Sequence, residues 1–251
     1  MNIQQLNAGL EYLVNESILN LDDNLKAIFM FGSGNHLRDF IPNLSDLDFI
    51  YILGVINYKN LQKISSIRED ANNVLNIKVD IKPFSIDEYS NGIKGKSSFE
   101  FFTGWGLEMM KRGEQRCLYN SGEIRLDYEI SDDWIKKDAI ERAHYYVTKL
   151  RKTFSASDKS ILRGEYKGLD NEDKLKIVSS SIKNVLTFCL AYKGIFVNSY
   201  DEVLDQSRFN FGEVSDFEEL FRTKKEVKYD KSILIKAYDK IEQIYKGVIN
   251  E

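Results

Sequence analysis

The sequence predicts an α+β protein in which a small mixed-sheet domain, residues 1–125, is followed by an all-helical bundle domain, residues 126–251. Short apolar runs bounded by turn residues, which are typical of strands, occur in the first half among stretches of helical periodicity. Beyond residue 126 the strand patterns largely disappear and apolar residues recur at helical spacing. No Pro/Gly-rich linker separates the two halves, so the change of pattern alone places the boundary.

The chain begins with five apolar residues at helical spacing, namely Leu6, Leu10, Leu13, Val14 and Leu21. This spacing predicts an amphipathic helix, which the polar residues 22–24 end. The apolar run at 27–31 is bounded by Gly32 and predicts a buried strand. A second run, at 48–53, is apolar at every position after Asp48, which is typical of a strand covered on both faces.

A second helix is predicted at residues 61–75, where apolar side chains again recur at helical spacing. Residues 77–82 alternate apolar and charged side chains with a period of two, so they predict a third strand, which Pro83 closes. The other expected elements are a short strand at 116–119 and helices at 100–111, 134–150, 175–192 and 234–248. Gly113 and Gly194 are the expected C-terminal stops of two of these helices.

The composition is that of a globular protein with a core of its own, with 43% hydrophobic and 29% charged residues. The formal net charge of −4 argues against nucleic-acid binding through a generally basic surface. The N-terminal segment lacks the features of a signal peptide, and no apolar run approaches the roughly 20 residues of a membrane span. The sequence therefore predicts a cytoplasmic protein without a membrane partner, in which Cys117 and Cys189 are reduced, buried thiols.

The pair Gly32-Ser33 follows the first predicted strand and has the chemistry of a phosphate contact. Gly32 has no side chain, so the backbone can approach a phosphate closely. Ser33 offers a hydroxyl and an amide, and a helix beginning near residues 34–35 would add further amides. The pair is not part of a Walker loop, because no Gly-Lys-Ser/Thr follows it. An ordinary turn is the alternative interpretation of these two residues taken alone.

Asp46 and Asp48 lie at the start of the second predicted strand. Side chains alternate along a strand, so both carboxylates point to one side of the sheet. They repel each other unless a cation or a proton lies between them, and hard oxygen ligands favour Mg²⁺. A solvated turn is the alternative, since Asp is common in turns. The buried run that follows favours the metal-binding interpretation, because it puts Asp48 at the mouth of the sheet.

Asp80 is the third acid of this predicted constellation. In the third strand, Lys78, Asp80 and Lys82 face the side opposite to the apolar positions. The alternative is a polar face that holds only charge pairs. If Asp80 lies beside the other two acids, three carboxylates can hold two Mg²⁺ ions, which would in turn hold a nucleoside triphosphate and activate an attacking hydroxyl.

Gly32-Ser33, twelve intervening residues, Asp46 and Asp48, and then Asp80 on a later strand resemble the DNA polymerase β-like nucleotidyltransferase superfamily. Its members share an apolar strand that ends in Gly-Ser, a D-x-D on the next strand and a third acid on a later one. These motifs cover about a fifth of the chain. The composite pattern is far more specific than any of its parts.

Size and a helical second half resemble the bacterial antibiotic nucleotidyltransferases, such as the aminoglycoside adenylyltransferases. The stretch 111–119 also resembles the helix, glycine and short strand that close the first domain of bacterial members. Many of these members carry Ala-Arg-Gly just after Gly-Ser. This chain departs from that pattern, with Arg38 as the nearest basic residue in the segment.

The resemblance implies a nucleotidyltransferase domain at residues 1–125 and a helical acceptor-binding domain at residues 126–251. Gly32 and Ser33 would bind the phosphates of ATP or another nucleoside triphosphate. Arg38 and Lys183 would be further phosphate contacts, although a solvated lysine is the plain alternative for Lys183.

The same resemblance implies that Asp46 and Asp48 bind two Mg²⁺ ions and that Asp80 binds the catalytic ion and takes the proton of the acceptor hydroxyl. Some relatives use a glutamate of the second domain as the base, for which Glu141 is a candidate. AMP would pass from ATP to a hydroxyl of a small molecule such as an aminoglycoside, which implies antibiotic resistance.

Two alternatives remain at this stage. A toxin-type nucleotidyltransferase would carry out the same chemistry on tRNA or protein, although the excess of acidic residues gives no sign of a basic stripe for RNA. A non-catalytic module that binds a nucleotide or a partner is the other, and the presence of all three acids argues against it. Homodimerisation is left open by the sequence.

Overall fold

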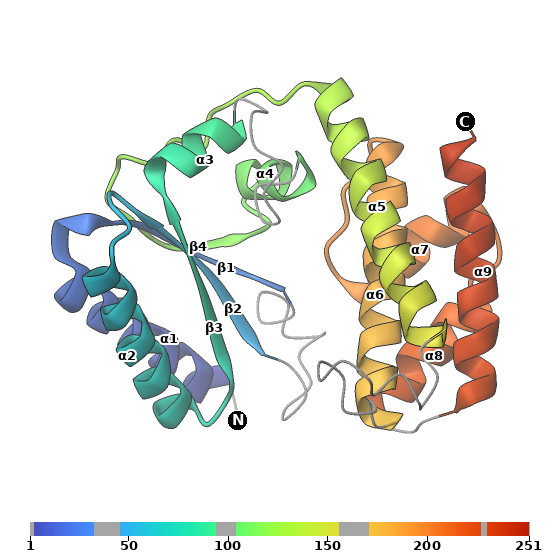
Figure 1. Cartoon of the computed structure of the whole chain (residues 1–251), viewed down its shortest axis with the longest axis horizontal. Helices are drawn as coiled ribbons and strands as arrows, with labels where there is room; N and C mark the ends of the chain where they lie inside the picture. Colours follow the sequence, from blue (N-terminus) through green and yellow to red (C-terminus); the bar gives the residue numbers. More distant parts are fainter. Residues whose placement is uncertain (1–2, 33–45, 94–103, 156–170, 227–229, 251) are drawn as a thin grey trace. The chain divides into compact units, whose positions relative to one another are not determined.

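The computed structural model describes residues 3–32, 46–93, 104–155, 171–226 and 230–250 (Figure 1). The chain divides into two compact units, Met1–Ile130 and Ser131–Glu251. The boundary predicted from the sequence lies between residues 125 and 126. In the described part of the chain all strands lie in the first unit and the second unit is helical, so the protein is α+β, as predicted.

The first unit is built on a four-stranded mixed sheet. Its strands are β1 (Leu25–Phe31), β2 (Leu47–Leu53), β3 (Val79–Ser85) and β4 (Arg116–Asn120), and its α-helices are α1 (Ile3–Leu21), α2 (Tyr58–Leu75), α3 (Ile86–Ile93) and α4 (Gly104–Lys111). A single 3-10 turn, Asp22–Asn24, joins α1 to β1. The strand order is β3-β2-β1-β4, with β3 parallel to β2 and both other pairs antiparallel.

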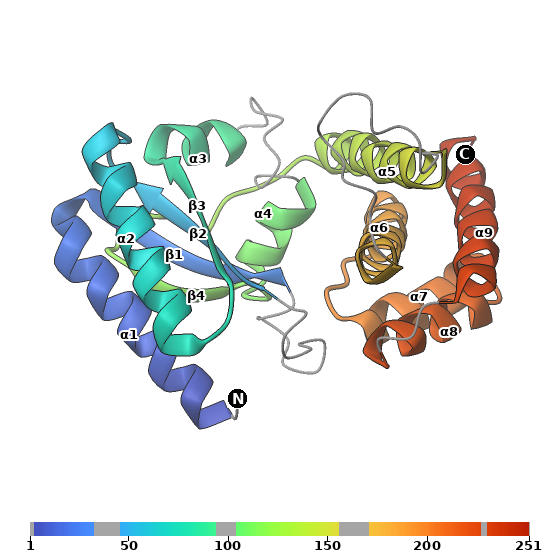
Figure 2. The ribbon, with the colours of Figure 1, turned by 60° about the horizontal axis from the view of Figure 1, so that its bottom comes forward.

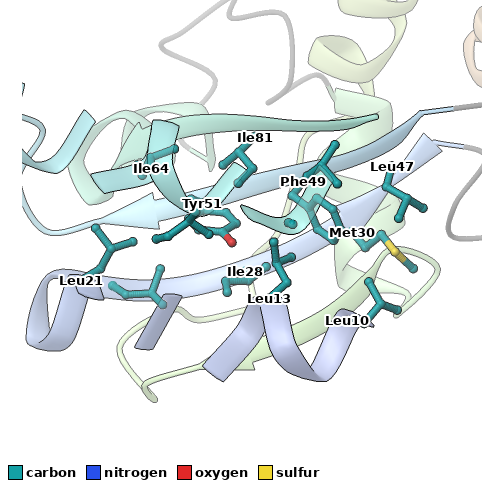
Figure 3. Packing of buried hydrophobic residues seen from close by; sticks show 14 of the residues in the cluster. Leu10, Leu13, Leu21, Ile28, Met30, Leu47, Phe49, Tyr51, Ile64 and Ile81 are labelled. Atoms are coloured by element: carbon teal, nitrogen blue, oxygen red, sulfur yellow. The ribbon is translucent and has the colours of Figure 1, made fainter. Parts of the chain in front are cut away.

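Helices α1 and α2 lie side by side along one face of this sheet, and α4 lies on the other side (Figures 1 and 2). The main core forms under α1 and α2 (Figure 3). There Leu13 of α1 packs with Phe49 and Tyr51 of β2, and all three side chains are fully buried. The Tyr51 hydroxyl shares a hydrogen bond of 2.6 Å with the hydroxyl of Ser17 on α1, so its polar atom is satisfied within the core.

Strand β2 is covered on both faces, as its continuous apolar run predicts. Leu47, Phe49 and Tyr51 belong to the main core, whereas Ile50 and Ile52 are buried against the opposite face. Asp48 shares this opposite face and lies one residue from the beginning of the strand. The polar residue is therefore placed where the buried strand begins, not in its middle.

The prediction that Pro83 closes the third strand is wrong. β3 continues to Ser85, and Pro83 pairs with Tyr51 in the parallel register. β3 is an edge strand of the sheet, so the missing N–H of proline can lie on the unpaired side without cost to the ladder. The same strand begins two residues later than predicted, at Val79.

Helix α3 was not predicted, yet the sequence carries a signal for it. The Ser85 hydroxyl accepts a hydrogen bond of 3.1 Å from the backbone N–H of Glu88, and the Glu88 carboxylate accepts one of 2.7 Å from the N–H of Ser85. This reciprocal pair is a capping box of the Ser-x-x-Glu type. The expected helix at 100–111 is described from Gly104 onward as α4, and its first residues lie outside the described ranges.

The second unit contains the helices α5 (Asp132–Ser155), α6 (Asn171–Tyr192), α7 (Tyr200–Phe211), α8 (Ser215–Lys225) and α9 (Lys231–Ile249). α6 packs against each of the other four, and its predicted apolar stripe, including Val178, Ile182 and Cys189, is buried. The predicted helices of this half correspond to α5, α6 and α9. α7 and α8 were not predicted. Across the described ranges, no helix combines the length and apolar character that crossing a bilayer requires.

Candidate functional site

Three neighbouring strands bring the central residues of the candidate site into one row. In the antiparallel pair, Phe31 of β1 lies opposite Asp48 of β2, and in the parallel pair Asp48 lies opposite Asp80 of β3. Since residues in register on paired strands project to the same face, the two carboxylates are cross-strand neighbours. The row lies at the end of the sheet where β1 finishes and β2 and β3 begin.

Gly32 directly follows β1 and lies beside Asp48. Its backbone has φ = +71°, a left-handed conformation that glycine adopts without a side-chain penalty. A Cβ atom at this position would lie 2.7 Å from Oδ2 of Asp48, well inside contact distance. The absence of a side chain at Gly32 therefore keeps open the space next to the carboxylate.

Asp46 lies just before β2 and is linked to the start of β3. Lys78 Nζ donates a hydrogen bond of 2.7 Å to Asp46 Oδ2, and the N–H of Leu47 donates one of 2.9 Å to the carbonyl of Lys78. The bond to Asp46 raises the pKa of Lys78. The side chain of Lys78 is 70% exposed and that of Asp46 is 26% exposed, so water surrounds the lysine more than the carboxylate.

Lys82 bridges the other two acids. Its Nζ lies 3.3 Å from Oδ2 of Asp80 and 3.9 Å from Oδ1 of Asp48. The same ammonium lies 5.2 Å from the centre of the Phe31 ring, within the range of a cation–π contact. One positive charge is therefore shared by both carboxylates and an aromatic face.

The pKa of Asp48 is strongly raised. Its side chain is 27% exposed, and burial raises its pKa from the ordinary value to about 6. Lys82 and Lys78 oppose this rise, while the charges of Asp80 and Asp46 add to it. The charges of Asp46 and Asp80 therefore lie close enough to Asp48 to act on its pKa.

The donor set fits a hard divalent cation such as Mg²⁺. One ammonium already contacts both Asp48 and Asp80, so a single cation can be held between them. Gly32 leaves space beside Asp48 that any other side chain would fill. Within the described ranges, however, no group of three or more His, Cys, Asp or Glu side chains is gathered closely enough to enclose a metal ion, and the acids are paired with lysines.

The lysines are the site residues whose role the sequence analysis missed. Lys78 and Lys82 were assigned only to the charge pairs of the alternative interpretation. Those pairs exist, and they are made with the three predicted acids themselves. The signal was present in the period-two alternation, which puts Lys78, Asp80 and Lys82 on one side of the strand.

The other predicted phosphate contacts fall in different places. Ser33 and Arg38 lie outside the described residues. Lys183 belongs to α6 of the second unit, where its Nζ lies 4.3 Å from the centre of the Tyr200 ring. Lys224 Nζ approaches the same ring and donates a hydrogen bond of 2.6 Å to the Tyr200 hydroxyl. Glu141, the alternative base, is exposed on α5 of that unit.

Two of the surface hollows in the described ranges lie apart from the three acids. The first unit has one of about 430 Å³, with Tyr89, Ile124 and Tyr128 in its wall. The second unit has one of about 530 Å³ between α5 and α9, where Arg151 forms an ion pair with Glu242. Gly32 and Asp46 flank residues 33–45 in the sequence, and these residues lie outside the described ranges.

Comparison with known proteins gives no match from which a function could be assigned, so the assignment depends on the residues of the site. No family model matches the chain, and no curated protein matches it significantly. The resemblance stated from the motifs therefore rests on Gly32, the D-x-D pair and Asp80, together with the geometry described above.

Proposed function

We propose that this protein is a metal-dependent nucleotidyltransferase that transfers a nucleoside monophosphate, AMP from ATP, to a hydroxyl group of a small molecule. One observation carries the proposal. At one end of the sheet Gly32 lies against the carboxylate of Asp48, and Asp48 is the cross-strand neighbour of Asp80. A glycine turn next to a carboxylate pair suits a phosphate chain that binds together with divalent cations.

In the proposed reaction, Asp46, Asp48 and Asp80 would hold two Mg²⁺ ions, and Gly32 and Ser33 would lie against the phosphates. When bound, the ions would supply charge neutralisation and lower the pKa of the acceptor hydroxyl. Asp80 would accept the hydroxyl proton as the acceptor oxygen forms a bond to the α-phosphorus. The bond from the α-phosphorus to the pyrophosphate oxygen breaks in the same displacement, and the chain contributes mainly position and charge.

A small, hydroxyl-rich, cationic acceptor such as an aminoglycoside is the class that we propose. The excess of acidic over basic residues favours a cationic acceptor over a polyanion. Residues 126–251 would supply the acceptor-binding part of the enzyme.

The test is transfer of label from ATP in the presence of Mg²⁺ and a panel of aminoglycosides, tRNA and proteins. We expect label from [α-³²P]ATP, and none from [γ-³²P]ATP, to appear on an aminoglycoside. Asp48→Asn and Asp80→Asn should each lower the rate at least about 100-fold, because each would remove a metal ligand. Asp70→Asn, an exposed change on α2 at the opposite face of the sheet, is the matched control and should retain the rate.

The outcomes separate the proposal from its alternatives. Label on RNA or protein would keep the transferase chemistry and overturn the small-molecule acceptor. Transfer of the γ-label would indicate a kinase. If no acceptor is labelled, or if Asp48→Asn is as active as the wild type, the proposed chemistry is wrong.

A further inference from the structure

Lys82 occupies an unusual position for a lysine on an edge strand. Its ammonium contacts two carboxylates, at 3.3 Å and 3.9 Å, and lies over the Phe31 ring. The side chain is 30% exposed, so part of its hydration shell is replaced by protein. Lys78, in contrast, is 70% exposed, and it forms an ion pair with Asp46. The Lys82 interactions are therefore less screened by water than the Lys78 pair.

Lys82 also matches the place that a divalent ion would take. Asp48 and Asp80 are direct cross-strand neighbours, and two ionised carboxylates at that separation repel each other. The ammonium compensates this repulsion in the metal-free protein. A metal ion that bridges the same two carboxylates would have to displace it, because a cation cannot share the position with another cation.

A charge count gives the direction of the effect. With all groups ionised, Asp46, Asp48 and Asp80 together with Lys78 and Lys82 carry a net charge of about −1. Two bare divalent ions would bring this local charge to about +3, which opposes their binding. The triphosphate of ATP carries about four negative charges and restores a net negative value. Lys82 thus weakens the binding of free ions more than the binding of ions that arrive with a nucleotide.

Resting on the proposed function, we propose that Lys82 is a resident counter-cation that holds Asp48 and Asp80 together in the metal-free protein and makes divalent-ion binding depend on the nucleotide. It acts as a positioning residue through the two carboxylates. The proposal concerns ion occupancy and not the chemical step, so it can be tested without measuring turnover.

The test is Mn²⁺ binding, followed by electron paramagnetic resonance, with and without the non-hydrolysable α,β-methylene analogue of ATP. Lys82→Met keeps the length of the stem and removes the charge, so Mn²⁺ should bind on the order of tenfold more tightly without the analogue. With the analogue, the difference should shrink to within about threefold. Lys82→Arg keeps the charge and should behave as the wild type does. Lys59→Met, at an exposed position of α2, is the control for net charge.

Each outcome decides a separate claim. If Lys82→Met and its second neutral variant, Lys82→Gln, bind free Mn²⁺ no more tightly than the wild type while Asp48→Asn loses Mn²⁺ binding, the inference is wrong and the proposed function stands. If Lys59→Met tightens binding as much as Lys82→Met, the effect is one of net charge and the inference is wrong. If the wild type binds Mn²⁺ with the analogue no better than Asp48→Asn does, both proposals fail. Circular dichroism of each variant verifies that it is folded.

Discussion

Asp48 is a carboxyl group whose surroundings favour its neutral form, because burial raises its pKa to about 6 even with Lys82 close by. A folded-state pKa above the unfolded value means that the native protein binds the proton more tightly than the unfolded chain does. The stability from this group is present below pH 4 and is lost as the pH rises through about 6. Ionised Asp48 therefore lowers the free energy of unfolding in metal-free solution at neutral pH.

Asp48→Asn should remove this pH dependence. The pKa difference of about two units sets an upper limit near 3 kcal/mol, and partial exposure reduces the expected gain to about 1–2 kcal/mol at pH 8. At pH 4 the variant and the wild type should unfold at the same urea concentration. Urea unfolding in EDTA buffer between pH 4 and pH 8 measures the difference. If the free energy of unfolding changed with pH in the same way for both proteins, the raised pKa of Asp48 would be contradicted. Asp70→Asn is the control and should follow the wild type at every pH.

Gly32 is the second residue on which the site depends. Alanine at this position would place its Cβ 2.7 Å from Asp48 Oδ2 and would also have to adopt φ = +71°. We expect Gly32→Ala to lower the free energy of unfolding by about 2–3 kcal/mol and to weaken binding of Mn²⁺ with the ATP analogue, because the carboxylate must move. Urea unfolding and Mn²⁺ titration measure the two effects.

Gly113 offers a closely matched control for this change. Its φ is +72°, but a Cβ there would meet no atom within 4 Å. Gly113→Ala should therefore show the backbone penalty alone, about 1 kcal/mol, with unchanged Mn²⁺ binding. Equal effects of the two substitutions on Mn²⁺ binding would mean that the contact between Gly32 and Asp48 has no role in the site.

At the scale of elements, the connection from β2 through α2 to β3 is what brings two acids together. Parallel strands begin at the same end of a sheet, and Asp48 and Asp80 are each the second residue of their strand. Sequence periodicity predicted both strands and the face of each acid, because alternation is a local property. It gave no information on register, which depends on contacts between segments some 30 residues apart.

The errors at this scale also have local causes. Pro83 was interpreted as a strand end because proline lacks an N–H, but at the edge of the sheet that group is not needed. Helix α3 was missed although its capping box, Ser85 and Glu88, can be recognised in the sequence. In both cases the residue type alone was not enough. Its position, at the edge of the sheet or at the start of a helix, determined its structural effect.

The capping box of α3 can be tested directly. Ser85→Ala removes the acceptor of the Glu88 N–H, so it should lower the free energy of unfolding by about 1 kcal/mol. Ser66→Ala removes an exposed hydroxyl within α2 and should be neutral or slightly stabilising, because alanine is the better helix former. Urea unfolding of both variants gives the comparison. A loss for Ser66→Ala as large as that for Ser85→Ala would show that the cap itself contributes nothing.

At the scale of the whole molecule, the sequence alone was sufficient for the class of fold. The strand patterns in one half and the helical spacing in the other predicted an α+β chain, and the described elements agree. The phosphate contacts predicted for Ser33, Arg38 and Lys183 stay predictions, because periodicity carries no information about which side chains meet a ligand. Two lie outside the described residues, and the third has Tyr200 as its neighbour in the helical unit.

The amino-acid order by itself determined which residue types are present, that the strands lie in the first half and helices make up the second, and to which side of its strand each of Asp48 and Asp80 points, because these follow from local periodicity and backbone chemistry. Only the tertiary structure decided that Asp48 lies opposite Asp80, that Gly32 closes against it, and that Lys82 is the cation between them. Long-range strand pairing fixes these neighbours, and burial at the sheet end then favours the neutral form of Asp48.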